Sequence, residues 1–181
     1  PYVVEAVMEL LNKRDGLILG ICNGFQALIK LGLLPYGEIR ETDEESPTLT
    51  FNKIGRHISR MVRTKVVSNL SPWLKNTDVG DVFTIPISHG EGRLVSNEGV
   101  FNEMKKNGQI ATQYVDPLGN ASYNGDFNPN GSYQSIEGIT SPDGRIFGKM
   151  GHSERIGVNL YKNITGRFDQ KLFEAGIDYF K

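Results

Sequence analysis

The sequence is short of cysteine, of long hydrophobic runs and of net charge, and each shortage excludes a class of protein. Its single cysteine, Cys22, cannot form a disulfide within the chain or a zinc site made of several cysteines, so we expect a reducing, cytoplasmic location. Apolar runs such as residues 17–22 are too short to cross a bilayer. A formal net charge of −1 argues against nucleic acid or an anionic membrane as the main partner.

Size and composition describe one globular domain over residues 1–181. Hydrophobic residues make up 38% of the chain and charged residues 23%, which suits a protein with a buried core. No linker-like segment, repeat or low-complexity run divides it. A helical pattern begins at once, with no strand before it, so we expect a domain that is incomplete at its N-terminus and belongs to a longer chain.

The start of the chain predicts a layered α/β fold. Apolar residues within 3–11 recur at helical spacing, residues 16–21 form an apolar run typical of a strand buried on both faces, and residues 23–31 return to helical spacing. This order predicts a mostly parallel central sheet flanked by helices. We also expect strands within 48–67 and at 82–88, 109–115 and 145–150, helices at 100–106 and 167–175, and a long loop at 116–133.

Positive charge gathers after residue 48, where Arg56, Arg60, Arg63 and Lys65 stand among β-branched residues. Two interpretations remain open for this segment. The side chains contact an anionic ligand or another subunit, or they form the solvated face of a sheet.

The segment Gly20-Ile21-Cys22-Asn23-Gly24 lies between an apolar strand and a helix and is the most specific feature of the sequence. A nucleophile on a sharp strand-to-helix turn requires small residues two positions before and after it. The helix N-terminus would favour the Cys22 thiolate, and the backbone N–H of Asn23 would form half of an oxyanion hole. The alternative is a buried core cysteine.

A cysteine nucleophile requires a base, and the chain has three histidines. His152 is the preferred candidate, because Glu154, two residues on, would point to the same side and fix the imidazole tautomer. His89 is a rival base, although the glycines that follow it indicate a close backbone approach. His57 is expected to be structural or exposed.

Residues 20–28 (Gly-Ile-Cys-Asn-Gly-Phe-Gln-Ala-Leu) resemble the nucleophile elbow of class I, or triad, glutamine amidotransferases, and His-Ser-Glu-Arg at 152–155 resembles the His-x-Glu element of that family. Residues 89–93 (His-Gly-Glu-Gly-Arg), 127–132 (Phe-Asn-Pro-Asn-Gly-Ser) and 136–139 (Ile-Glu-Gly-Ile) are similar to the glutaminase domain of phosphoribosylformylglycinamidine synthase. The likeness covers nearly the whole chain.

The resemblance implies a Cys22-His152-Glu154 triad that hydrolyses glutamine, with Gln26 in the glutamine pocket. It implies a binding or coupling role for His89 and a substrate-binding role for Asn130 in a loop near the active site, although turn chemistry alone also explains the Asn130 segment. The ammonia would serve ATP-dependent amidation of formylglycinamide ribonucleotide in purine biosynthesis. A synthetase domain, in the same or a partner chain, would bind the ATP and Mg, whereas glutamine hydrolysis would require no metal or cofactor.

The sequence departs from the family pattern beside the proposed base, where Gly151 and Ser153 replace two usual prolines, and at Phe25, where a cysteine is frequent. No triad residue is lost, but the loop that carries His152 is less constrained. Two further functions stay open: a glutaminase that serves another synthetase, and a non-catalytic amidotransferase-like module that binds a partner.

Overall fold

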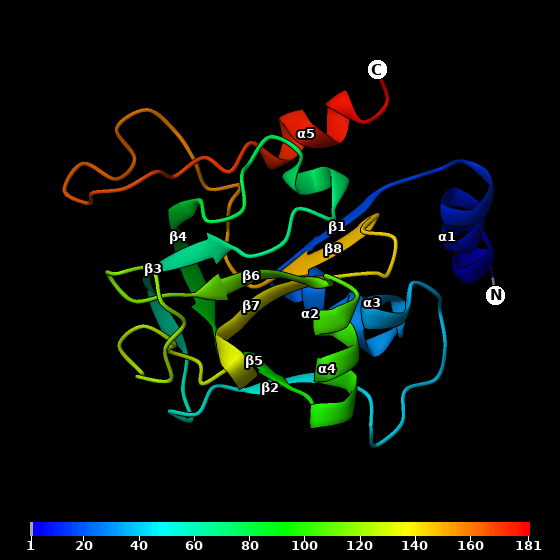
Figure 1. Cartoon of the computed structure of the whole chain (residues 1–181), viewed down its shortest axis with the longest axis horizontal. Coiled ribbons are helices and arrows are strands. Elements are labelled where there is room, and N and C mark those ends of the chain that lie inside the picture. Colours follow the sequence, from blue (N-terminus) through cyan, green and yellow to red (C-terminus); the bar gives the residue numbers. More distant parts are fainter. Residues whose placement is uncertain (1) are drawn as a thin grey trace.

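A computed structural model of the chain describes residues 2–181 as a sheet with helices on both faces (Figure 1). The elements in chain order are α1 (Tyr2–Lys13), β1 (Ile18–Ile21), α2 (Asn23–Lys30), α3 (Leu33–Tyr36), β2 (Thr48–Phe51), β3 (Ile58–Val66), a 3-10 turn η1 (Pro72–Leu74), β4 (Val82–His89), β5 (Glu91–Val95), α4 (Glu98–Lys106), β6 (Ile110–Tyr114), η2 (Tyr133–Ser135), β7 (Ile136–Thr140), β8 (Ile146–Lys149) and α5 (Leu172–Asp178). No helix among these is long and apolar enough to span a membrane.

The main sheet has six strands in the order β1-β8-β7-β6-β3-β4, and β2 pairs with β5 in a separate ribbon. The α/β class is confirmed, but the sheet is mixed, because β1 and β8 pair in parallel while the other neighbours in the sheet are antiparallel. The prediction of a mostly parallel sheet is therefore wrong for these strands. Connections such as residues 141–145, between β7 and β8, are too short for the crossover that parallel neighbours require.

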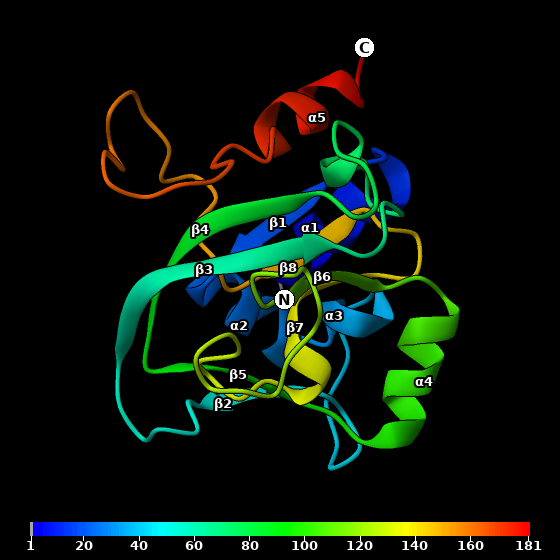
Figure 2. The same cartoon turned by 60° about the vertical axis from the view of Figure 1, so that its left-hand side comes forward.

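Two apolar clusters cover the two faces of the sheet (Figures 1 and 2). One lies under α2, α3 and α4 and includes Phe25, Leu34 and Met104. The other lies under η1 and α5 and includes Leu74 and Leu172. Figures 1 and 2 both show α5 on the opposite side of the sheet from α2 and α4.

Most predicted elements are confirmed, and the differences have local causes. Strand β1 is less buried than expected, since only Gly20 among its four residues is fully buried and the strand is outermost in the described sheet. Helix α5 begins at Leu172 rather than at residue 167. Strands β5 and β7 were missed, because Glu91 and Glu137 interrupt the apolar patterns by which strands are recognised.

Candidate active site

Cys22 lies on the turn between β1 and α2 in a strained backbone conformation. Its φ of 53° is in the left-handed region, and its N–H donates to the carbonyl of Lys149 at 2.8 Å. A Cβ on Gly20 would lie 2.5 Å from Leu28 Cδ1 and 2.8 Å from the carbonyl carbon of Gly24, so the first small residue of the elbow is required. A Cβ on Gly24 would have no neighbour within 4 Å, so close packing does not explain the second.

The Cys22 thiol is half-buried and donates to the carbonyl of Ser88 at 3.8 Å. Burial raises the pKa of this thiol and outweighs the lowering by the Asn23 N–H and by Arg155. The N–H at the start of α2 does favour the thiolate, as expected, but burial disfavours it by more. At neutral pH the sulfur carries its proton, so it requires a base to become a nucleophile.

His152 and Glu154 form the second half of the site on the turn after β8. Glu154 Oε1 lies 2.6 Å from His152 Nδ1, as the spacing predicts. Because β1 and β8 are parallel neighbours, with Ile21 opposite Lys149, their carboxyl ends bring this turn to the same edge of the sheet as Cys22. His152 Nε2 lies 3.4 Å from an Arg155 nitrogen. Within residues 2–181, no hydrogen bond joins this imidazole to the Cys22 thiol. The triad remains a prediction.

Gln26 connects helix α2 to the first residue of β5. Its side-chain amide donates to the carbonyl of Glu91 at 2.6 Å, so the elbow and the His89–Arg93 segment are in direct contact. Asn23, on the first turn of α2, is exposed. These positions leave the predicted roles of Gln26 and Asn23 in the glutamine site open to test.

His89 is buried, with 5% of its surface exposed, and its contacts argue against a role as the base for Cys22. Its Nδ1 lies 3.0 Å from Asn52 Oδ1, and its Nε2 has no hydrogen-bond partner in the described residues. A Cβ on Gly92 would lie 2.4 Å from the His89 ring, which accounts for one of the two glycines. Burial lowers the pKa of His89 to about 4, so the ring is neutral at pH 7.

We predict that His89 makes the domain acid-labile. Its folded pKa of about 4 lies below the ordinary value of 6.5, so the unfolded chain binds a proton that the native ring does not. The stability from this neutral ring is complete above pH 6.5 and is lost as the pH falls toward 4. Denaturant titrations at pH 7 and pH 4 should show the wild type losing roughly 3 kcal/mol more than His89→Gln. Equal losses in the two proteins would contradict this.

Asn130 is fully buried, and its side chain holds the 116–133 loop together. Its amide donates to the carbonyl of Gly92 at 2.7 Å and to Tyr114 at 3.1 Å, and its oxygen accepts from Ser132 N–H at 3.0 Å. Both ends of its amide are engaged and the side chain is fully buried, so in this structure Asn130 anchors a loop. Turn chemistry, the simpler of the two interpretations, describes what the structure shows here.

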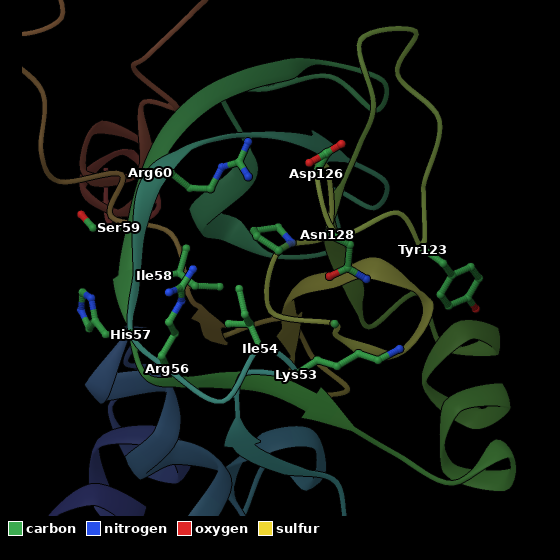
Figure 3. A pocket seen from close by; sticks show the side chains of 13 residues that line it. Lys53, Ile54, Arg56, His57, Ile58, Ser59, Arg60, Tyr123, Asp126 and Asn128 are labelled. Atoms are coloured by element: carbon green, nitrogen blue, oxygen red, sulfur yellow. The ribbon is translucent and has the colours of Figure 1, made fainter.

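A hollow of about 870 Å³ opens beside this site, lined by the β2–β3 connection and by the 116–133 loop. Figure 3 shows Arg60 reaching from β3 across the hollow and Lys53 along its rim. Lys53, Arg56 and Arg60 form no ion pair with any acidic side chain of the described residues. Of the positive segment in the sequence, Arg56 and Arg60 therefore line a concave surface.

The hollow is connected to the cysteine through a short contact. His57 is exposed, as expected, and its Nε2 lies 3.3 Å from Ser88 Oγ. The carbonyl of Ser88 is the acceptor for the Cys22 thiol. Sequence reasoning missed Ser88, because a serine at the end of a strand carries no signal of its own.

A half-buried elbow cysteine at the carboxyl edge of an α/β sheet, with a His–Glu pair at the end of the neighbouring strand, is the arrangement that thiol-dependent acyl transfer uses. A family model described as a CobB/CobQ-like glutamine amidotransferase domain matches residues 1–180, and the chain belongs to this family.

Individual proteins are also similar in sequence to this chain. The chain is 43% identical over 155 residues to the phosphoribosylformylglycinamidine synthase subunit PurQ of Methanococcus maripaludis, covering 83% of this chain and 54% of that protein. It is 36% identical over 163 residues to the PurQ subunit of Gloeobacter violaceus, covering 90% and 63%. The chain thus spans between half and two thirds of the length of these relatives.

One solved structure is also similar to this chain in fold and sequence. One chain in the structure of PurLQS from Thermotoga maritima is similar to this chain with a TM-score of 0.72 and 30% identity. The similarity covers 99% of this chain and 68% of that one.

Proposed function

We propose that this chain is the glutaminase part of a phosphoribosylformylglycinamidine synthase, and that it releases ammonia from glutamine for ATP-dependent amidation of formylglycinamide ribonucleotide. The observation that carries the proposal is the elbow cysteine on β1 beside the His152–Glu154 pair after β8. Similarity to PurQ subunits at 36–43% identity supports the choice of acceptor.

The reaction runs through a thioester. His152 takes the proton of the Cys22 thiol, and the sulfur attacks the side-chain amide carbon of glutamine. The N–H of Asn23 stabilises the oxygen that becomes negative. His152 then gives its proton to the leaving nitrogen, ammonia departs, and water hydrolyses the glutamyl thioester to glutamate and the free thiol. Glu154 holds the imidazole in the tautomer that both transfers require.

Ammonia is consumed by the synthetase part, which binds the ATP and Mg and lies in the same or a partner chain. The test follows amidation of formylglycinamide ribonucleotide by the full-length protein, with glutamine or ammonium chloride as nitrogen donor. Activity with both donors supports the proposal. Glutamine hydrolysis without amidation of this acceptor would indicate a glutaminase that serves another synthetase. Ammonium-driven amidation with no glutamine-driven reaction would indicate a module that only binds its partner.

The cationic hollow supports a site for that partner. Its unpaired Lys53, Arg56 and Arg60 favour an acidic surface of the synthetase part, and its contact with Ser88 through His57 supports a junction next to the thiol. An interface here would shield the ammonia from bulk water. The solvated-face interpretation predicts no effect from changing these charges.

We expect the double variant Arg56→Glu/Arg60→Glu to lower glutamine-driven amidation about 10-fold or more, with ammonium-driven amidation unchanged, because like charges now face each other across the junction. The loss should deepen at low salt, where screening is weaker. Lys13→Glu/Lys30→Glu, two exposed charges on α1 and α2, is the matched control. Equal activity of the two double variants would contradict a docking role for the hollow.

A further inference from the structure

A charged pair lies in the interior of the sheet directly behind the proposed base. Glu137 on β7 and Lys149 on β8 both have fully buried side chains, and Lys149 Nζ lies 3.3 Å from Glu137 Oε1. Burial lowers the pKa of Lys149, and the charge of Glu137 opposes that shift. Neither residue has a role in the reaction described above, and neither faces solvent.

Apart from the bond that Glu137 Oε2 accepts from the Thr112 hydroxyl on β6, the other side-chain hydrogen bonds of the pair end on the two neighbours of His152. Lys149 Nζ donates to the carbonyl of Gly151 at 3.1 Å and to Ser153 Oγ at 2.7 Å. Glu137 Oε1 accepts from the N–H of Gly151 at 2.6 Å. The carbonyl and N–H of Gly151 and the hydroxyl of Ser153 are thus fixed by two side chains of the sheet.

The segment held in this way has one other side-chain restraint from outside the loop, a hydrogen bond that Ser153 Oγ donates to Gln170 Oε1. Gly151 has no side chain, and glycine loses the most conformational freedom when it is ordered. A Cβ there would lie 2.1 Å from Ile85 Cδ1 and 2.9 Å from Glu137 Oε1, so the backbone passes tightly between β4 and the carboxylate. His152 itself has two backbone hydrogen bonds: its N–H donates to the carbonyl of Pro86 at 2.9 Å, and its carbonyl accepts from the N–H of Arg155 at 3.2 Å.

Stability alone does not account for a pair in this place. Taking two charges out of water is costly, and apolar residues of similar volume at such sites are often as stable or more stable. The two charges instead fix the orientation of the Gly151 peptide groups, because an ammonium and a carboxylate hold hydrogen-bond donors and acceptors at set angles. An apolar pair could fill the same space but could not fix the Gly151 peptide groups.

We propose that the Glu137–Lys149 pair positions His152 for proton transfer, by fixing the backbone on both sides of it. The proposal rests on the proposed function, because it takes His152 as the base. Both members act through the loop, so they are positioning residues and do not touch the substrate. A displacement of about 1 Å at a catalytic group can cost on the order of 100-fold in rate.

The test compares the full-length wild type with Glu137→Gln/Lys149→Met, which removes both charges and leaves no unpaired one. We expect kcat for glutamine hydrolysis to fall about 10- to 100-fold while KM stays within about twofold. Hydrogen exchange measured by mass spectrometry should become faster in residues 150–156 and stay unchanged elsewhere. Leu74→Ala, a cavity variant in the apolar cluster under η1 and α5, is the control for general loss of stability and should keep kcat.

Unchanged kcat and unchanged exchange over residues 150–156 in the double variant would overturn the proposal. A uniform rise in exchange along the chain, with the same loss of kcat in Leu74→Ala, would overturn it as well, since the pair would then be merely structural. If the wild type itself hydrolyses no glutamine, the proposed function fails. The exchange of residues 150–156 would still decide whether the pair orders the loop.

Discussion

Replacing Cys22 by alanine is expected to lower glutamine-driven amidation by at least about 10⁴-fold, while ammonium-driven amidation stays within about twofold of the wild type. The variant removes the sulfur that forms the thioester, and neither His152 nor the half oxyanion hole at Asn23 can replace a nucleophile. Added ammonium bypasses the thiol. The measurement is product formation with each nitrogen donor at saturating ATP and acceptor.

The control for Cys22→Ala is Thr64→Val. Thr64 is buried in β3, and its hydroxyl has no hydrogen-bond partner in residues 2–181, so an isosteric valine should leave both reactions unchanged. If Cys22→Ala keeps glutamine-driven activity, the triad is idle. Another group would then release ammonia from glutamine, and the proposed role of Cys22 would be wrong.

The single variant Lys149→Met is expected to destabilise the domain by about 3–5 kcal/mol, because it leaves the Glu137 carboxylate buried without its cation. Glu137→Gln in the same background should recover most of that loss, since the second substitution removes the unpaired charge. Denaturant unfolding of the wild type, the single variant and the double variant measures the coupling between the two residues.

Additive effects in that cycle would contradict the pairing of Lys149 with Glu137. The stability cycle and the hydrolysis assay answer separate questions. The first asks whether the two charges depend on each other, and the second asks whether they serve His152. A double variant that is as stable as the wild type but slow in hydrolysis would show both.

Local signals in the sequence were enough to predict the elbow turn and the contact between His152 and Glu154. A nucleophile between an apolar strand and a helix, with Gly20 two residues before Cys22, indicates a sharp strand-to-helix turn. Few other sequence patterns predict this backbone shape. His152 and Glu154 are two residues apart, and their 2.6 Å contact follows from extended geometry on one short segment. Both inferences depend only on neighbours along the chain.

The direction of the strands was less accessible from sequence. Helix, apolar run and helix indicated an α/β layer, but whether the later strands return as hairpins is decided by pairing between distant segments. Strands β6 and β7 run antiparallel to both of their neighbours in the sheet, whereas β8 is antiparallel to β7, to which a short link joins it, and parallel to β1. Apolar pattern gives the burial of a strand and leaves its direction open.

The sequence by itself determined the α/β class, the elbow at Cys22 and the His152–Glu154 pair, because each depends on residues that are close along the chain. Only the tertiary structure decided the burial of His89 and Asn130, the protonated state of the Cys22 thiol and the hollow beside Ser88. It also decided the contact of Lys149 with Glu137. These depend on desolvation and on hydrogen bonds between segments far apart in sequence, and such effects exist only once the chain has packed.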